Sequence, residues 1–308
     1  MRKNRFISAA AVIIPIVAGG FCVSGCGGSS KAPATPGVLQ IVAAENFWGS
    51  LVSQVGGEHV EVVYIVSDPN ADPHEFASTA ATARAFASAD YVILNGAGYD
   101  SWGDKLLSAS VNPHQKVLKV ADLLGKKAGD NPHFWYSPVY VNQVVEKMRD
   151  DLTALDPKNA ADYRQQYQAL LSSLVQYQNR ITSIGKQFRG TKVAATEDIF
   201  SYLAEAADLD LISPPSFMQA VAEGDDPPPQ SLVEFQNQLK NKEPAVLVYN
   251  QQTVTPLTEG IKKLAADEGI PVIGITETIQ PPDASFQEWM DAQLILLENA
   301  LNAKALGK

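Results

Sequence analysis

The regular alternation of short apolar runs with helical stretches most constrains how this chain folds. Apolar runs of strand length occupy residues 38–44, 60–66, 91–95, 116–120, 192–196, 245–249 and 271–276. Between them lie stretches with helical spacing, including residues 47–55, 79–88, 199–207, 232–240 and 257–268. Because strands that alternate with helices form βαβ units, we predict an α/β fold whose sheets are mostly parallel.

A long polar segment divides this pattern into two halves. From Pro157 to residue 189, just before Gly190, apolar side chains recur mainly three or four residues apart, at Tyr163, Tyr167, Leu170, Leu171, Leu174, Tyr177 and Ile181. This spacing predicts one amphipathic helix about 45 Å long. It could be a surface helix that covers one sheet or a rigid strut that joins two lobes. We favour the strut, because the strand–helix alternation restarts after it. The predicted lobes are therefore residues 38–156 and 190–308.

The first residues have the pattern of an export signal. Arg2, Lys3 and Arg5 precede an apolar stretch over residues 7–23, and the sequence VSGC resembles a bacterial lipobox. We predict a signal peptide over residues 1–25, cleavage before Cys26 and a lipid on its thiol. A membrane-spanning anchor is the alternative, but the apolar run is short and contains proline and glycine. Residues 26–37 predict a flexible tether that holds the domain at the outer face of the cytoplasmic membrane.

Charge and cysteine content exclude several classes of protein. The chain has 24 Lys and Arg and 34 Asp and Glu, a net charge of −10. Loss of three basic residues with the signal leaves 21 against 34, or −13. Such a balance argues against a nucleic-acid partner. With only Cys22 and Cys26, a disulfide framework and a CxxC zinc site are also excluded. Metal chemistry would therefore depend on four histidines and on carboxylates.

Two of the four histidines lie where parallel sheets place their ligands. His74, in DPNADPHEF, follows the second predicted strand, and His133, in DNPHFWYSP, precedes the helix that starts near Pro138. A preceding proline restricts the backbone and fixes the direction of each imidazole. We predict both as metal ligands. His59 and His114 lie in turns at strand starts and are expected to be ordinary surface residues.

Two glutamates occupy the matching positions in the second half. Glu197 follows the strand 192–196 and Glu277 follows the strand 271–276. Both are expected at the carboxyl edge of a parallel sheet, where open α/β sheets bind ligands. The alternatives are a helix-capping carboxylate, for which Asp198 is better placed than Glu197, and an ordinary exposed glutamate at position 277.

Several motifs together resemble one family. Residues 72–102, DPHEFASTAATARAFASADYVILNGAGYDSW, are the most specific segment. NPHFWYSP (131–138), TEDIFSYL (196–203), ITETIQ (275–280) and a region like the family's interlobe loop (216–232) follow in order. Over residues 38–301 the chain resembles the TroA-like (cluster A-I) zinc- and manganese-type solute-binding lipoproteins of bacterial ABC transporters.

The resemblance implies a two-lobed α/β protein, not an enzyme, with a metal site in the cleft between the lobes. Its ligands are His74, His133, Glu197 and Glu277. Glu197 stands where zinc-type members usually have histidine and manganese-type members glutamate, and Glu277 stands where the family usually has aspartate. The implied role is to capture a divalent metal as a monomer and to deliver it to an ABC permease.

Two imidazoles and two carboxylates favour Mn²⁺, with Zn²⁺ close behind and Fe²⁺ a third candidate. The absence of a histidine-rich stretch before residue 131 points the same way, since zinc-specific relatives often carry one. Two alternatives remain: a two-lobed binding protein for another solute, such as haem or a chelate, and a surface adhesin. A zinc hydrolase would need an open metal position, which four protein ligands would fill, and an HExxH helix is absent from the sequence.

Overall fold

A computed structural model describes residues 37–68, 76–109 and 112–306. The predicted signal peptide, Cys26, almost all of the tether and His74 lie outside the described residues. The predictions for these segments therefore stay predictions. Within the described part of the chain, every helix is too short or too polar to cross a lipid bilayer.

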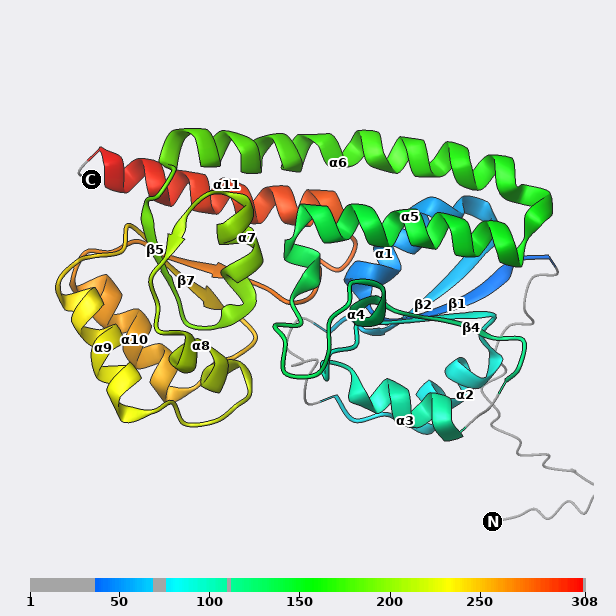
Figure 1. Cartoon of the computed structure of the whole chain (residues 1–308), viewed down its shortest axis with the longest axis horizontal. Coiled ribbons are helices and arrows are strands. Elements are labelled where there is room, and N and C mark those ends of the chain that lie inside the picture. The colour runs from blue at the N-terminus through cyan, green and yellow to red at the C-terminus, as the bar shows by residue number, and fades with distance from the viewer. Residues whose placement is uncertain (1–36, 69–75, 110–111, 307–308) are drawn as a thin grey trace, which may run out of the picture. The chain divides into compact units, whose positions relative to one another are not determined.

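The described residues form two four-stranded sheets whose strand pairs are all parallel, which confirms the predicted fold class (Figure 1). The first sheet has the strand order β2 (Val60–Val66), β1 (Leu39–Glu45), β3 (Tyr91–Leu94) and β4 (Lys116–Lys119). The second has the order β6 (Asp210–Leu211), β5 (Lys192–Ala195), β7 (Leu247–Asn250) and β8 (Val272–Ile275).

The central strands are apolar on both faces because helices cover both sides of each sheet. On β1 and β3, Ile41 and Ile93 face the main core, whereas Val42 and Val92 face a separate cluster beneath α2 and α3. The second sheet repeats this division. Val193 and Val248 face the main core, and Leu247 faces a cluster with the helices on the other side.

The helices of the first lobe have the following bounds: α1 (Asn46–Gly56), α2 (Ala80–Ser88), α3 (Ser101–Ala109), α4 (Val120–Leu123) and α5 (Pro138–Leu155). Their starts follow local chemistry. The Thr79 hydroxyl accepts a hydrogen bond from the backbone of Thr82 in a capping box at α2, and Ser137 caps α5, which has proline in its first turn.

The helices of the second lobe are α7 (Ser201–Ala206), α8 (Pro215–Ala222), α9 (Pro229–Lys240), α10 (Pro256–Asp267) and α11 (Phe286–Ala305). Two elements differ from expectation. The region 216–232, expected as a loop, begins with most of α8, whose Phe217 and Val221 are buried. Strand β6 was not predicted, because its two residues are too few to show a strand pattern.

The long helix α6 (Ala160–Phe188) spans both lobes, which supports its interpretation as a strut (Figure 1). A single 3₁₀ turn, Pro157–Asn159, precedes it. Its apolar stripe packs against α1 and α5 of the first lobe and against α7 and α11 of the second. Helix α11 lies beside it and is held by Arg180, whose guanidinium pairs with Asp291 at 2.6 Å and with Glu298 at 2.7 Å.

The buried stripe of α6 leads to a stability prediction. Leu174→Ala should lower the free energy of unfolding by about 2–5 kcal/mol, because Leu174 is fully buried between the helices. The control is Val175→Ala on the next residue, which is 48% exposed and should change the free energy by less than about 0.5 kcal/mol. Urea unfolding followed by circular dichroism measures both, and equal losses would contradict the assigned packing.

Candidate metal centre

The carboxyl edges of the two sheets supply the candidate ligands. In the second lobe, Glu197 lies two residues beyond β5 and Glu277 two residues beyond β8. In the first lobe, His133 lies in the loop between α4 and α5. All three are buried, with 0% exposure for His133 and 1% for each glutamate. Both glutamates are therefore buried, although an exposed position was an alternative from the sequence alone.

The loop Asn131–His133 fixes the orientation of the histidine ring. The Asn131 amide nitrogen donates to the backbone oxygen of Asp198 at 2.6 Å, so the amide oxygen points toward the ring. That oxygen lies 2.8 Å from His133 Nδ1, which therefore carries the hydrogen. Nε2 is then the ring nitrogen with a lone pair for a metal. The tautomer is thus assigned from the hydrogen bonds of Asn131.

The carbonyl before His133 is held from the first sheet. Asn95, directly after β3, donates from its amide to the backbone oxygen of Pro132 at 2.9 Å. The amide oxygen of Asn95 accepts the indole N–H of Trp48 at 3.0 Å. Gly96 follows in the left-handed region at φ 79°, where a Cβ would lie 2.9 Å from that of Ala121. Glycine is therefore required for this close turn.

Glu197 and Glu277 are linked by one amide group. Asn250, the last residue of β7, donates from Nδ2 to Glu197 Oε2 at 3.0 Å and to Glu277 Oε1 at 2.6 Å. The Tyr99 hydroxyl donates to Glu277 Oε2 at 2.6 Å from the other lobe. One oxygen of each glutamate therefore accepts from the same nitrogen, and Glu277 is also held across the interface.

The electrostatics of these groups favour an incoming cation. Burial, followed by repulsion from Glu277, raises the pKa of Glu197 to about 8, against the opposing effects of Asn250 and His133. Burial lowers the pKa of His133, but Asp198 and the two glutamates outweigh it, so the net shift is upward. Like charges buried together resist ionisation until a positive ion neutralises them.

Two buried acids at the same edge were missed by the sequence analysis. Glu45 ends β1 and is 0% exposed, and neither of its oxygens has a hydrogen-bond partner among the described residues. Burial, then the charge of Asp100, raises its pKa well above the ordinary value. Burial also raises the pKa of Asp100 to about 6, although the backbone N–H groups of Asn95 and Gly96 donate to its carboxylate at 2.6 and 2.8 Å.

A signal for Glu45 was present. It follows an apolar strand directly, as Glu197 does, and the same edge argument applies to it. It lies between the strand predicted over 38–44 and the helix predicted over 47–55. Asp100 gave no comparable signal, because its burial depends on the fold of the loop that follows Gly96.

Hydrogen bonds join the lobes around the centre. The side chain of Asn46 accepts from the backbone N–H of Ile279 at 3.0 Å and donates to its carbonyl at 3.4 Å. Tyr136 donates to the carbonyl of Thr276 at 2.8 Å, and Tyr202 donates to that of Asn131 at 3.0 Å. Ile279 and Thr276 lie within two residues of Glu277, and Asn131 lies two residues before His133. The position of these candidate ligands therefore depends on the contact between the lobes.

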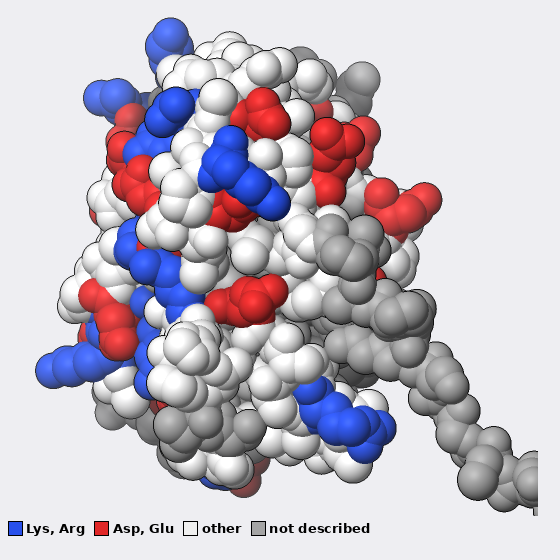
Figure 2. Space-filling view, turned by 90° about the vertical axis from the view of Figure 1, so that its right-hand side faces the viewer, with Lys and Arg blue, Asp and Glu red and all other residues white. Residues whose placement is uncertain are grey.

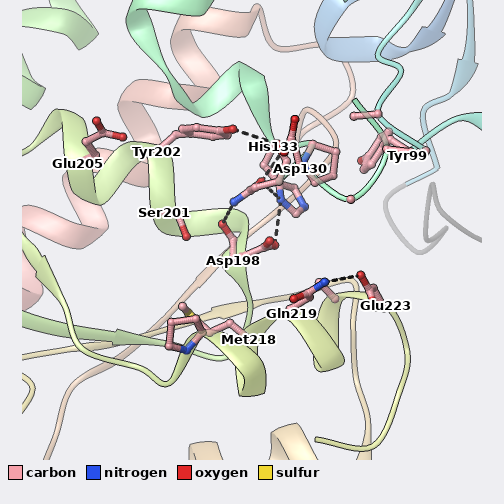
Figure 3. Close-up of a pocket in the computed structure, with 18 residues that line it drawn as sticks. Tyr99, Asp130, His133, Asp198, Ser201, Tyr202, Glu205, Met218, Gln219 and Glu223 are labelled. Carbon is pink, nitrogen blue, oxygen red and sulfur yellow. Dashed lines mark hydrogen bonds and ion pairs between the residues drawn. The ribbon is translucent and has the colours of Figure 1, made fainter. Parts of the chain in front are cut away.

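A cavity of about 590 Å³ opens beside His133 and Asp198 (Figure 3). Asp130, Asp198, Glu205 and Glu223 are its acidic lining residues, and none of its described lining residues is Lys or Arg. The end of the molecule shown in Figure 2 differs, because acidic and basic side chains are interspersed there. An acidic cavity of this kind would admit a positively charged solute.

The remaining histidines lie apart from the centre. His59 ends a 3₁₀ turn, and its Nε2 lies 2.9 Å from Asp162 at the start of α6. His114 is exposed in a turn. Among the residues that the structure describes, no three His, Cys, Asp or Glu side chains are close enough to hold a metal by themselves. The predicted ligand His74 lies outside that set.

Comparisons with known proteins give a consistent result. Residues 41–300 match the family model described as ZnuA, zinc-uptake complex component A, periplasmic. The manganese-binding lipoprotein MntA of Bacillus subtilis is 26% identical over 49% of this chain. The match spans about half of that relative's length, 53%.

Two further proteins match over most of the chain. The metal ABC transporter substrate-binding lipoprotein FimA of Streptococcus parasanguinis is 23% identical, over 85% of this chain and 87% of its own. Among solved structures, FpvC of Pseudomonas aeruginosa in complex with Mn²⁺ has a TM-score of 0.72 and 21% identity, over 86% of this chain and 98% of its own. The similarity to FpvC shows a shared fold.

The raised pKa values predict how metal-free stability depends on pH. Glu197 binds a proton more tightly in the folded state than in the unfolded state, where its pKa is near 4.5. The contribution of Glu197 to the free energy of unfolding is therefore fully present below that pH and is lost as the pH rises toward about 8. Chemical unfolding in the presence of a chelator, at several pH values, measures the trend. Glu197→Gln should flatten it, and a wild-type protein that gains stability over this range would contradict the assignment.

Proposed function

Because the chain belongs to the ZnuA family of periplasmic zinc-uptake components, we propose that it captures a divalent transition metal outside the cytoplasm and delivers it to an ABC permease. The observation that carries this proposal is the buried group of His133, Glu197 and Glu277 at facing sheet edges, with one lobe supplying the imidazole and the other the carboxylates.

We assign the ligands as His74, His133, Glu197 and Glu277. His133 is supported by its burial and by the hydrogen bond from Nδ1 to Asn131, which fixes the orientation of its ring. Glu197 is supported by its burial and by Oε1, which has no hydrogen-bond partner among the described residues. His74 rests on its sequence motif alone.

The donor set favours Mn²⁺, with Zn²⁺ close behind and Fe²⁺ third. Two carboxylates match the preference of Mn²⁺ for oxygen ligands, while the general order of affinity at a mixed nitrogen–oxygen site favours Zn²⁺ over Mn²⁺. Coordination geometry and the supply of each metal would then decide which one is carried. We further propose that the protein is a monomer and that a lipid on Cys26 anchors it at the outer face of the cytoplasmic membrane.

One observation favours a second candidate function. The cavity beside His133, at about 590 Å³, is much larger than a bare ion requires. The cargo could therefore be a metal with a small bound chelator that carries cationic or hydrogen-donor groups, since the described walls are acidic. Comparing the affinity for free Mn²⁺ with that for Mn²⁺ in such a complex separates the two candidates.

Loss of a ligand should abolish tight binding. His133→Ala, His74→Ala and Glu197→Ala should each lower the affinity for Mn²⁺ and Zn²⁺ by more than about 100-fold, because they remove direct ligands. His114→Ala, a surface histidine, is the control and should bind as the wild type does. Isothermal titration of the metal-free full-length protein measures each. Loss of binding in His114→Ala with normal binding in His74→Ala would show that the ligands are misassigned.

Metal binding should release protons. Glu197, with a pKa of about 8, holds a proton near neutral pH that a metal must displace. Affinity should therefore rise with pH up to about 8 and fall in acid. Calorimetry in two buffers of different ionisation enthalpy counts the protons released. Glu197→Gln should release fewer, and equal heats in both buffers for the wild type would contradict the prediction.

A further inference from the structure

We propose that Asn250 is a positioning residue that restricts Glu197 to binding the metal through one oxygen, Oε1. This inference deepens the metal-carrier function proposed above and rests on it. Asn250 does not itself contact the metal in this arrangement. It acts by holding the second oxygen of Glu197.

The position of Asn250 follows from the strand order. Strand β7 lies between β5 and β8, and the chain beyond those two strands carries Glu197 and Glu277. Asn250 ends β7, opposite Ile275 of β8, and is 1% exposed. A side chain at the carboxyl end of this middle strand therefore lies between the two glutamates, which explains why its Nδ2 reaches both, at 3.0 and 2.6 Å.

The orientation of the Asn250 amide is fixed by its other end. Its oxygen accepts the backbone N–H of Gln252 at 2.9 Å, so the NH₂ group must face the carboxylates. Rotating the amide by half a turn would place its oxygen against two carboxylates and its donors against an N–H group. Gln252 adds to this order, because its side-chain oxygen accepts the backbone N–H groups of Glu277 and Thr278 at 2.6 and 3.0 Å.

The two oxygens of Glu197 are consequently not equivalent. Oε2 is tied to Asn250, whereas Oε1 is buried and has no hydrogen-bond partner among the described residues. Ligation through both oxygens would require Glu197 to turn away from Asn250 and give up a hydrogen bond to its buried carboxylate, which is costly. Ligation through Oε1 alone keeps the hydrogen bond.

Glu277 shows no such difference between its oxygens. Asn250 donates to Oε1 and Tyr99 to Oε2, both at 2.6 Å. Both oxygens of Glu277 accept a hydrogen bond, so Asn250 does not distinguish one of them from the other. What Asn250 sets for Glu277 is its separation from Glu197, because one NH₂ group serves both. Thr253, whose hydroxyl oxygen lies 3.1 Å from the same nitrogen, completes the set of acceptors.

The experiment uses the full-length protein, Mn²⁺ as the probe, calorimetry and the infrared difference spectrum between Mn²⁺-loaded and metal-free protein. The separation of the two carboxylate stretching bands distinguishes one-oxygen from two-oxygen ligation, and the bands lost in Glu197→Gln identify Glu197. The wild type should show the wide separation of one-oxygen ligation. Asn250→Ala should narrow it and weaken binding by about tenfold or more.

Two further variants separate this role from a structural one. Asn250→Asp keeps an oxygen to accept from Gln252 and so preserves the turn, but in its ionised form it cannot donate to Glu197. It should therefore give the narrowed bands of Asn250→Ala. Asn241→Ala, an exposed asparagine that follows α9, is the matched control and should leave both bands and affinity unchanged.

The outcomes distinguish the two proposals. If the wild type binds Mn²⁺ and both Asn250 variants keep its bands and its affinity, the role of Asn250 is wrong while the carrier function stands. A wild type that already shows two-oxygen ligation by Glu197 also overturns the inference. If the wild type binds no metal at all, the carrier function fails and this inference fails with it.

Discussion

Several acids lie buried close together in the interior of this protein. Glu197 and Glu277 share one neutral amide, and Glu45 and Asp100 are buried in the same region of the first lobe. Desolvation of like charges is expensive, so burial raises the pKa of Glu45, Asp100 and Glu197 and favours a proton or a cation beside them.

The contact between the lobes is part of the same arrangement. The Tyr99 hydroxyl of one lobe binds a carboxylate of the other, and Asn46 binds both backbone groups of Ile279, two residues beyond that carboxylate. The groups that hold the lobes together are therefore neighbours of the groups that would hold a metal.

Much of the fold could be predicted from the sequence. The strand–helix alternation predicted two parallel sheets, and the spacing of Tyr163, Tyr167 and Leu170 predicted the long helix, because both patterns reflect burial on a repeating geometry. Asn250 and Asp100 could not be found in this way, since their roles arise from strand order and loop conformation. Strand order is a long-range property: β7 lies between β5 and β8 only after the sheet has formed.

The helices α6 and α11 have a consequence for how the protein unfolds. One continuous hydrophobic core includes Ile41 and Trp135 of the first lobe, Leu174 of α6, and Val193 and Trp289 of the second. Because this core runs along the inner faces of both sheets, separating the lobes would expose apolar side chains of each. We therefore expect the two lobes to unfold as a single cooperative unit, and an ion bound between them would protect the entire domain against proteolysis and heat.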